Sequence, residues 1–244
     1  MAGANSGGME ARGLRLSYRL AGGALFTALD IDALTIEAGS AVGFLGPSGA
    51  GKTSLLYALT GIERPQSGTV SWGDDEITAL RESERDHWRR HNVGFIFQEF
   101  HLISGMSALQ NVLVPVSFEQ TTPSPEFRRR AEELLERVGA PHGRHTVDLL
   151  SRGEQQRVAV ARALIMSPGI ICADEPIASL DEENARAVMD LLFEIAGEAG
   201  STLLTVTHDP IFIDRLDVVH HMVLGKFTDG SGDVRAEAIG GGAS

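Results

Sequence analysis

Residues 46–53 read Gly-Pro-Ser-Gly-Ala-Gly-Lys-Thr, which is a complete G-x-x-x-x-G-K-[ST] phosphate-binding loop. The apolar run at residues 41–45 predicts a buried strand before the loop, and residues 54–59 have helical spacing after it. The motif needs this context, because the loop holds phosphates at the point where a strand turns into a helix. The sequence therefore predicts a nucleoside triphosphate site in an α/β fold.

Each residue type in this loop has a chemical role. The glycines let the backbone curl, so that successive N–H groups point inward at phosphate oxygens. We expect Lys52 to reach the β and γ oxygens of ATP, and the Thr53 hydroxyl to take one Mg²⁺ position. The expected nucleotide-binding residues of this segment are Gly46, Pro47, Ser48, Gly49, Ala50, Gly51, Lys52, Thr53 and Ser54.

Composition excludes several other classes of function. The chain has 244 residues and a formal net charge of −12, which argues against a broad electrostatic grip on nucleic acid or anionic lipid. Its single cysteine excludes an internal disulfide framework and is typical of a reducing compartment. No run of 18 uninterrupted apolar residues occurs, so direct membrane insertion is not expected. Any membrane role must involve a separate chain.

The pattern along the chain predicts one α/β domain over residues 14–227. Short apolar runs up to residue 72 predict β structure, and residues 82–91 predict a polar helix before a strand at 93–97. Strands at 169–173 and 202–206, separated by a helix at 182–196, indicate a parallel sheet. We thus expect a nucleotide core over about 14–98 and 163–227, interrupted by a helical subdomain over about 99–162. Residues 1–13 and 228–244, rich in Gly and Ala, are expected to form a flexible leader and tail.

Two acids follow the apolar strand expected at 169–173. Asp174, at the end of the strand beside the phosphate loop, can hold Mg²⁺, and Glu175 can orient or deprotonate the water that attacks the γ-phosphate. An Asp-Glu pair is by itself a weak signal, since it is common at solvated strand ends. Its combination with the phosphate loop favours the catalytic interpretation.

A further segment makes the interpretation specific. Residues 150–164, which begin Leu-Ser-Arg-Gly-Glu-Gln-Gln-Arg, resemble the L-S-G-G-Q hallmark and following helix of ABC-type ATPases. The resemblance implies a P-loop NTPase fold with a RecA-like core sheet, an N-terminal antiparallel β part and an inserted helical subdomain. It also implies a homodimer or heterodimer in which Ser151 and Gly153 of one subunit contact the γ-phosphate bound to the other.

The same resemblance implies roles for other residues. Gln98 resembles the glutamine that senses Mg²⁺ and the attacking water, and His208 resembles the histidine that contacts the γ-phosphate. Residues 178–181 resemble the loop that crosses the dimer interface. Tyr18 resembles the aromatic residue that stacks on adenine, with Phe26 as its competitor. The implied catalytic residues are Glu175, His208 and Gln98, and the implied metal ligands are Thr53, Gln98 and Asp174.

Within this family the chain resembles the lipoprotein-releasing and macrolide-export branch (LolD/MacB-type), which includes FtsE-like ATPases. The residues concerned are 75–80, 89–98 and 109–112. This implies a peripheral subunit at the cytoplasmic face of the inner membrane, paired with a membrane-spanning subunit. Residues 99–122 would meet that subunit through an apolar contact of Phe100, Leu102, Ile103 and Met106, unless these side chains pack inside the helical subdomain.

Three departures from the family pattern leave the functional choice open. Arg152 replaces the first hallmark glycine, Glu154 replaces the glutamine, and Ile177 stands where this branch usually has threonine. Ser151 and Gly153 are retained, so the core chemistry can survive. One hypothesis is an ATPase that powers export or extraction through a membrane subunit. The alternative is an FtsE-like, ATP-gated regulatory switch that transports nothing.

Overall fold

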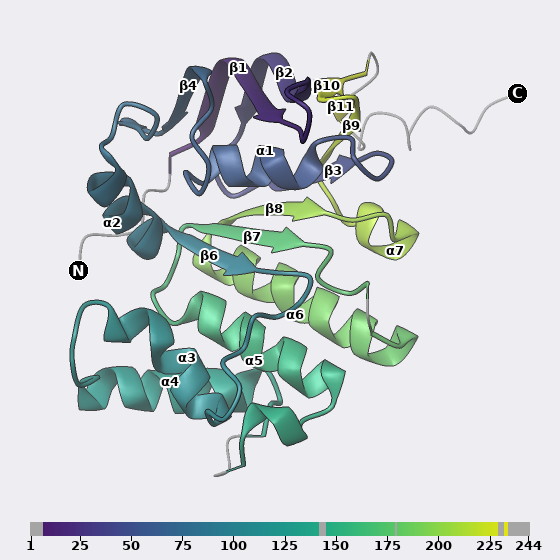
Figure 1. The fold of residues 1–244 in the computed structure, drawn as a ribbon. Coiled ribbons are helices and arrows are strands. Elements are labelled where there is room, and N and C mark those ends of the chain that lie inside the picture. The colour runs from purple at the N-terminus through teal and green to yellow at the C-terminus, as the bar shows by residue number, and fades with distance from the viewer. Residues whose placement is uncertain (1–6, 142–144, 179, 229–231, 234–244) are drawn as a thin grey trace, which may run out of the picture.

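The computed structural model describes residues 7–141, 145–178, 180–228 and 232–233, and they form two sheets with helices around them (Figure 1). The antiparallel sheet has the order β2 (Leu25–Ile36), β1 (Met9–Arg19), β4 (Ser67–Trp72), β5 (Asp75–Glu76). The main sheet has the order β10 (Lys226–Phe227), β9 (Val218–Val223), β3 (Ala41–Leu45), β8 (Thr202–Val206), β7 (Ile170–Asp174), β6 (Val93–Ile96), and β11 (Gly232–Asp233) pairs with β9. The expected α/β fold with parallel and antiparallel parts is confirmed.

The helices divide between the two faces of the main sheet. Helix α1 (Lys52–Leu59) lies between the main sheet and the antiparallel sheet, and α2 (Glu82–Asn92) leads into β6. On the other face lie α3 (Ala108–Ser117), α4 (Pro125–Arg137), α5 (Arg152–Leu164) and α6 (Glu182–Ala199). The short helices are η1 (Val147–Leu149) and α7 (Pro210–Ile213).

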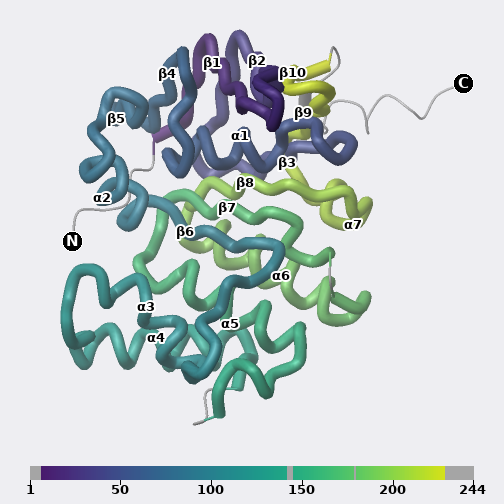
Figure 2. Tube along the Cα trace, viewed as in Figure 1, coloured from purple at the N-terminus to yellow at the C-terminus, as the bar shows by residue number. Residues whose placement is uncertain are grey.

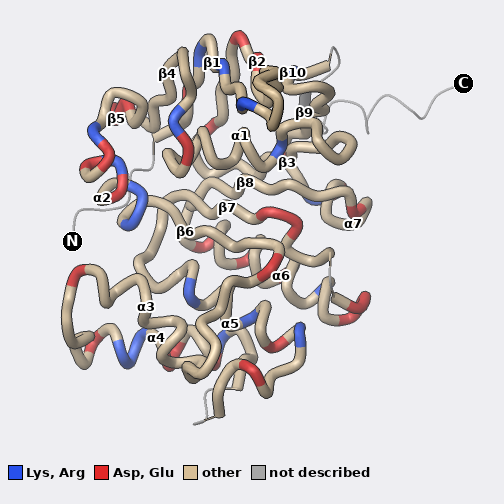
Figure 3. Tube along the Cα trace, viewed as in Figure 1, with Lys and Arg blue, Asp and Glu red and all other residues tan. Residues whose placement is uncertain are grey.

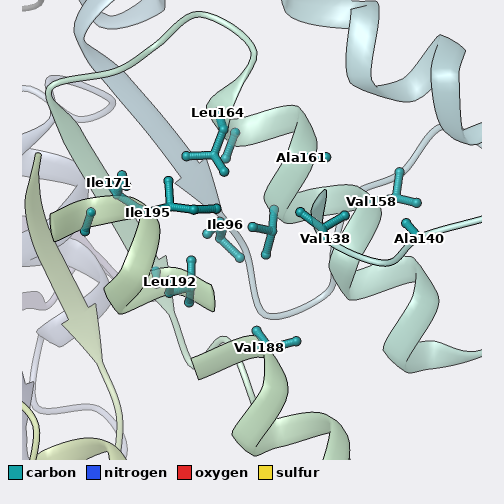
Figure 4. Packing of buried hydrophobic residues seen from close by; sticks show 14 of the residues in the cluster. Ile96, Val138, Ala140, Val158, Ala161, Leu164, Ile171, Val188, Leu192 and Ile195 are labelled. Carbon is teal, nitrogen blue, oxygen red and sulfur yellow. The ribbon is translucent and has the colours of Figure 1, made fainter. Parts of the chain in front are cut away.

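Burial on both faces explains why the central strands are continuous apolar runs. All five residues of β7 and of β8 are buried, as expected for parallel strands covered by helices on each side. Below the sheet, α5 is buried on most of its surface between its neighbours (Figure 4). The side chains that meet there include Ile96, Val138, Val158, Ala161, Leu164, Val188, Leu192 and Ile195.

Charged residues lie mainly outside these layers. Figure 3 shows β6, β7 and β8 free of charge until the acidic end of β7, whereas α2 and α4 carry both signs. Asp174 and Glu175 are therefore the charged groups that the central strands bring to their edge.

The prediction of a flexible leader over residues 1–13 is wrong for its second part. Met9 and Ala11 are buried, and residues 9–12 pair with both β2 and β4. The small residues in this segment pack closely against the neighbouring strands. They do not indicate disorder, because alternate residues of β1 face the core. In the predicted tail, Gly232 and Asp233 form β11. The rest of the predicted leader and tail, residues 1–6, 229–231 and 234–244, lies outside the described residues.

Candidate nucleotide-binding site

The site forms where several parallel strands end at one edge of the main sheet. Strands β3, β6, β7 and β8 run parallel, so their carboxyl ends meet at this edge (Figure 2). A cavity of about 540 Å³ opens there. The residues that line it are Phe26, Ala28, Gly46, Ser48, Gly49, Ala50, Gly51, Lys52, Thr53, Ser54, Gln98, Asp174, Glu175, Val206 and His208.

The loop between β3 and α1 needs glycine for steric reasons. Gly46 and Gly51 have φ of 149° and 98°. A Cβ atom at Gly46 would lie 2.1 Å from the carbonyl oxygen of Met222, and one at Gly51 would lie 2.2 Å from that of Ala28. The loop is thus pressed against β9 and β2, while a Cβ at Gly49 would meet only open space. This close backbone packing presents the N-terminus of α1 to the cavity, where a phosphate group is favoured.

Lys52 and Thr53 are the first two residues of α1. The Lys52 ammonium lies at the phosphate loop, and the Thr53 hydroxyl lies at the end of β7. The Lys52 ammonium donates to the carbonyl oxygens of Gly46 and Pro47 at 2.7 and 2.9 Å. Asp174 is only 8% exposed, and this burial raises the pKa of its carboxyl. A hydrogen bond with the Thr53 hydroxyl and the charge of Lys52 act in the opposite direction. A bound cation would likewise stabilise the ionised carboxylate.

The second acid, Glu175, lies between Gln98 and His208. The Gln98 amide donates to Glu175 Oε2 at 3.2 Å, and His208 Nδ1 lies 3.7 Å from Glu175 Oε1. Glu175 adopts a left-handed backbone conformation with φ of 46°, which costs free energy in a residue other than glycine. Strain of this kind is concentrated at functional sites, and here it turns the carboxylate toward the cavity after β7.

The donor set fits Mg²⁺ better than a metal held by protein alone. Across the described part of the chain, no three His, Cys, Asp or Glu side chains gather as a metal cluster. Thr53, Asp174 and Gln98 instead offer one hydroxyl, one carboxylate and one amide oxygen at the same cavity. Mg²⁺ typically takes one or two such ligands and completes its shell with water and phosphate oxygens.

The two aromatic candidates for base stacking face each other across β1 and β2 but have different surroundings. Phe26 is 39% exposed and lines the cavity. Tyr18 packs against the core, and its hydroxyl donates to Glu63 at 2.5 Å and lies 3.3 Å from Ser54 Oγ. Burial and the Glu63 carboxylate both raise the pKa of Tyr18. The cavity wall therefore favours Phe26, the competitor named from the sequence, over Tyr18.

The hallmark segment lies on the other side of the main sheet from α1. Ser151 is the exposed N-cap of α5, and its hydroxyl and backbone N–H both donate to Glu154 Oε2 at 2.8 Å. These bonds lower the pKa of Glu154. Gly153 is closely packed, since a Cβ there would lie 2.8 Å from Asn184 Oδ1. The structure thus places Ser151 and Gly153 outside the cavity that their own phosphate loop lines.

The segment expected at the dimer interface borders Glu175 and His208, two of the residues expected to be catalytic. Ala178 and Leu180 line a second cavity of about 310 Å³ together with Glu175 and His208. Asp181 accepts from the backbone N–H of Asn184 and caps α6. Ser179, which belongs to the same predicted loop, lies outside the described residues.

The apolar contact predicted for a membrane partner is only partly exposed. Phe100 is 5% exposed, which supports the alternative that this side chain packs inside the protein. Leu102 and Met106 are half-buried, and Ile103 is 41% exposed. A groove of about 480 Å³ lies nearby between α2, β6 and α3. Phe118, which the sequence analysis did not single out, lines it and is 69% exposed. Only its place after an amphipathic helix could have indicated an exposed aromatic.

A family model described as "ABC transporter" matches residues 29–178, which include the phosphate loop, the hallmark segment and both acids. The chain belongs to the ABC transporter family. Among curated proteins, this ABC transporter subunit is similar to a "Lipoprotein-releasing system ATP-binding protein LolD" of Idiomarina loihiensis. The two are 37% identical over 222 residues, which cover 89% of this chain and 96% of that protein. A LolD 1 protein of Rhodopseudomonas palustris is 38% identical over 88% of this chain and 95% of its own length.

Solved structures of ABC cassettes have the same fold. The dimeric post-hydrolysis state of the cassette MJ0796, bound to ADP and Pi, matches with a TM-score of 0.85 and 32% identity over 93% of this chain and 99% of that one. The cassette cbiO1 from Clostridium perfringens, part of the transporter complex cbiONQ, matches with a TM-score of 0.79 and 28% identity over 95% of this chain and 90% of its own. In the described part of this ABC subunit, no helix is both long and apolar enough to cross a membrane.

Proposed function

We propose that this chain binds and hydrolyses ATP as one of two paired ATPase subunits that power a membrane transporter of the LolD type. The observation that carries the proposal is the single cavity that gathers the phosphate loop, Asp174, Glu175, Gln98 and His208 at one sheet edge. Curated relatives at 37–40% identity are lipoprotein-releasing ATP-binding proteins, which favours transport over the regulatory alternative.

The cavity residues divide into binding and catalytic roles. The loop amides and Lys52 hold the phosphates, and Phe26 provides the stacking surface for the base. Thr53, Asp174 and Gln98 hold Mg²⁺, which neutralises charge on the phosphate oxygens when bound. Glu175 orients and accepts a proton from the attacking water, and His208 contacts the γ-phosphate from the β8 side.

A second copy of the chain completes the site. Ser151 is exposed at the N-terminus of α5, where hydroxyl and backbone donors suit a phosphate, yet it lies away from its own cavity. In a face-to-face pair, the Ser151 and Gly153 turn of each copy lies over the nucleotide of the other. The dimeric state of MJ0796 with ADP and Pi supports this arrangement.

The groove beside β6 is the docking site for the membrane subunit, which holds the ATPase at the cytoplasmic face. Its walls combine aromatic residues with arginines, and Phe118 is largely exposed in it. Arg89 is paired with Asp86, whereas the buried Arg90 Nε has no hydrogen-bond partner among the described residues. The chemistry fits an apolar segment that carries a carboxylate opposite Arg90.

The variant Glu175→Gln tests the proposed function. It keeps the shape of the cavity but removes the proton acceptor, so turnover should fall by about 10²–10⁴-fold while ATP affinity is retained. An ATP-bound dimer should accumulate, which size-exclusion chromatography coupled to light scattering can detect. Hydrolysis at the wild-type rate in this variant would remove Glu175 from its catalytic role.

A further inference from the structure

Helix α5 holds the segment after Gln98 at two places. This segment contains Phe100 and His101, whose φ values of 56° and 46° place two consecutive residues in the left-handed region. Residues with side chains rarely adopt this conformation, so surrounding contacts must stabilise it. Local backbone hydrogen bonds to Phe97 and Glu99 contribute, and long-range contacts come from the two ends of α5.

The C-terminal end of α5 contributes Arg162. Its guanidinium donates to the carbonyl oxygens of Phe100 and His101 at 2.5 and 2.6 Å. Arg162 is half-buried, and this burial lowers the pKa of its guanidinium. The two bonds fix the strained backbone, and both His101 and Arg162 also line the groove beside β6.

The N-terminal end of α5 contributes Arg152, one of the residues that depart from the hallmark pattern. Its guanidinium carbon lies 5.2 Å from the centre of the Phe100 ring, within the range of a cation–π contact. The ring is buried and the arginine is exposed. Arg152 directly follows Ser151, so the contact joins the hallmark turn to the segment that continues from Gln98. The glycine of the hallmark has no side chain to make it.

We propose that Arg152 is a positioning residue that locks the Ser151 turn to the Phe100–His101 segment, so that both move as one body. The proposal rests on the paired arrangement described under the proposed function. In that arrangement Gln98 contacts the subunit's own nucleotide and Ser151 contacts the partner's. The contact between Arg152 and Phe100 holds Ser151 in position to meet the nucleotide of the second copy. It also links the Ser151 turn to the docking groove, which His101 and Arg162 line.

The test is a double-mutant cycle in the Glu175→Gln background. Arg152→Met removes the charge and keeps the stem, Phe100→Leu removes the ring, and the double variant combines both. Arg152→Lys and Phe100→Tyr retain a cation and a ring. Arg129→Met replaces an exposed arginine of α4 that pairs with Glu133 and makes no cation–π contact among the described residues. Sedimentation velocity with MgATP gives the dimer dissociation constant of each variant, and equilibrium binding of a fluorescent ATP analogue to the monomer gives its nucleotide affinity.

We expect Arg152→Met and Phe100→Leu each to raise the dimer dissociation constant about four- to 25-fold, since one cation–π contact corresponds to about two- to fivefold per site and a dimer has two sites. The double variant should be no weaker than either single variant, because each already removes the same contact. Monomer ATP affinity should stay unchanged, the two conservative variants should recover most of the dimer, and Arg129→Met should match the reference.

Other results overturn the proposal in distinguishable ways. Additive effects, or a loss with Arg152→Met but not with Phe100→Leu, would mean that Arg152 acts directly on the partner's nucleotide. Unchanged dimerisation in Arg152→Met would show that the contact has no role. If the Glu175→Gln reference itself forms no dimer with MgATP, the paired arrangement fails and this inference fails with it. Circular dichroism identifies any variant that does not fold. If Phe100→Leu does not fold, the comparison of Arg152→Met with Arg152→Lys decides whether the cation at this position is needed.

Discussion

At the scale of single residues, Phe26 and Tyr18 show how two facing aromatics acquire different roles. They are paired across β1 and β2, but only Phe26 lines the nucleotide cavity. We expect Phe26→Leu to raise the ATP dissociation constant about two- to tenfold, the contribution of one aromatic stacking contact. Isothermal titration of the purified subunit with ATP measures this change.

Tyr18→Leu is the matched control for Phe26. It removes the hydrogen bond to Glu63 and part of the core packing, so thermal stability should fall. ATP affinity should change less than twofold, since the ring does not line the cavity. The opposite order of effects on ATP affinity would return the stacking role to Tyr18.

At the scale of structural elements, the sequence predicted the strands and helices that position the site. The apolar runs at 41–45, 169–173 and 202–206 became β3, β7 and β8, because buried parallel strands need apolar side chains on both faces. Since parallel strands end at a common edge, the strand pattern already indicated that the phosphate loop and Asp174 would meet, and the family resemblance added His208.

What the sequence could not predict depends on contacts between distant elements. Phe26 and Tyr18 lie opposite each other on β2 and β1, so the choice between them depends on which of the two side chains reaches the cavity beside the phosphate loop. The burial of Phe100 depends on a left-handed turn that Arg162 of α5 stabilises. The pairing of residues 9–12 depends on β2, the next strand, and on β4, which follows only after β3 and α1. No local pattern carries this information.

The groove beside β6, which several elements form together, leads to a prediction about binding to the membrane partner. Phe118→Glu places a carboxylate on the exposed aromatic of the groove, where it repels an acidic, apolar partner segment and can pair with nearby arginines. We expect the fraction of the subunit that sediments with membranes of the source cells to fall at least tenfold, while the ATPase rate of the isolated subunit stays the same.

Leu20→Glu is the control for this experiment, since Leu20 is 50% exposed on the loop after β1 and does not line the groove. It should leave membrane sedimentation unchanged. Equal losses in both variants would show that added charge, rather than the groove, weakens the association.

At the scale of the whole molecule, the proposed pairing predicts that the ATPase rate depends on protein concentration. Neither Ser151 nor Gly153 lines the cavity formed by their own phosphate loop, so in the proposed paired arrangement an isolated subunit has an incomplete site. Groups supplied by a partner in phosphoryl transfer contribute about 10³–10⁵ in rate. We therefore expect the steady-state rate to rise with the square of subunit concentration while monomers dominate, and linearly once dimers do. Constant specific activity in a range where sedimentation shows only monomer would contradict the shared site.

Mixing two inactive variants separates a shared site from simple stabilisation by dimerisation. Ser151→Ala and Glu175→Gln are each expected to be nearly inactive, yet both retain the phosphate loop and bind ATP. In a mixed dimer, the Ser151→Ala subunit keeps Glu175 at its own nucleotide and receives Ser151 from the other subunit, which restores one complete site. An equimolar mixture should recover up to about a quarter of wild-type activity, since half of the dimers are mixed and each has one intact site of two. A site built within one chain predicts no recovery, because every subunit in the mixture then lacks one of its groups.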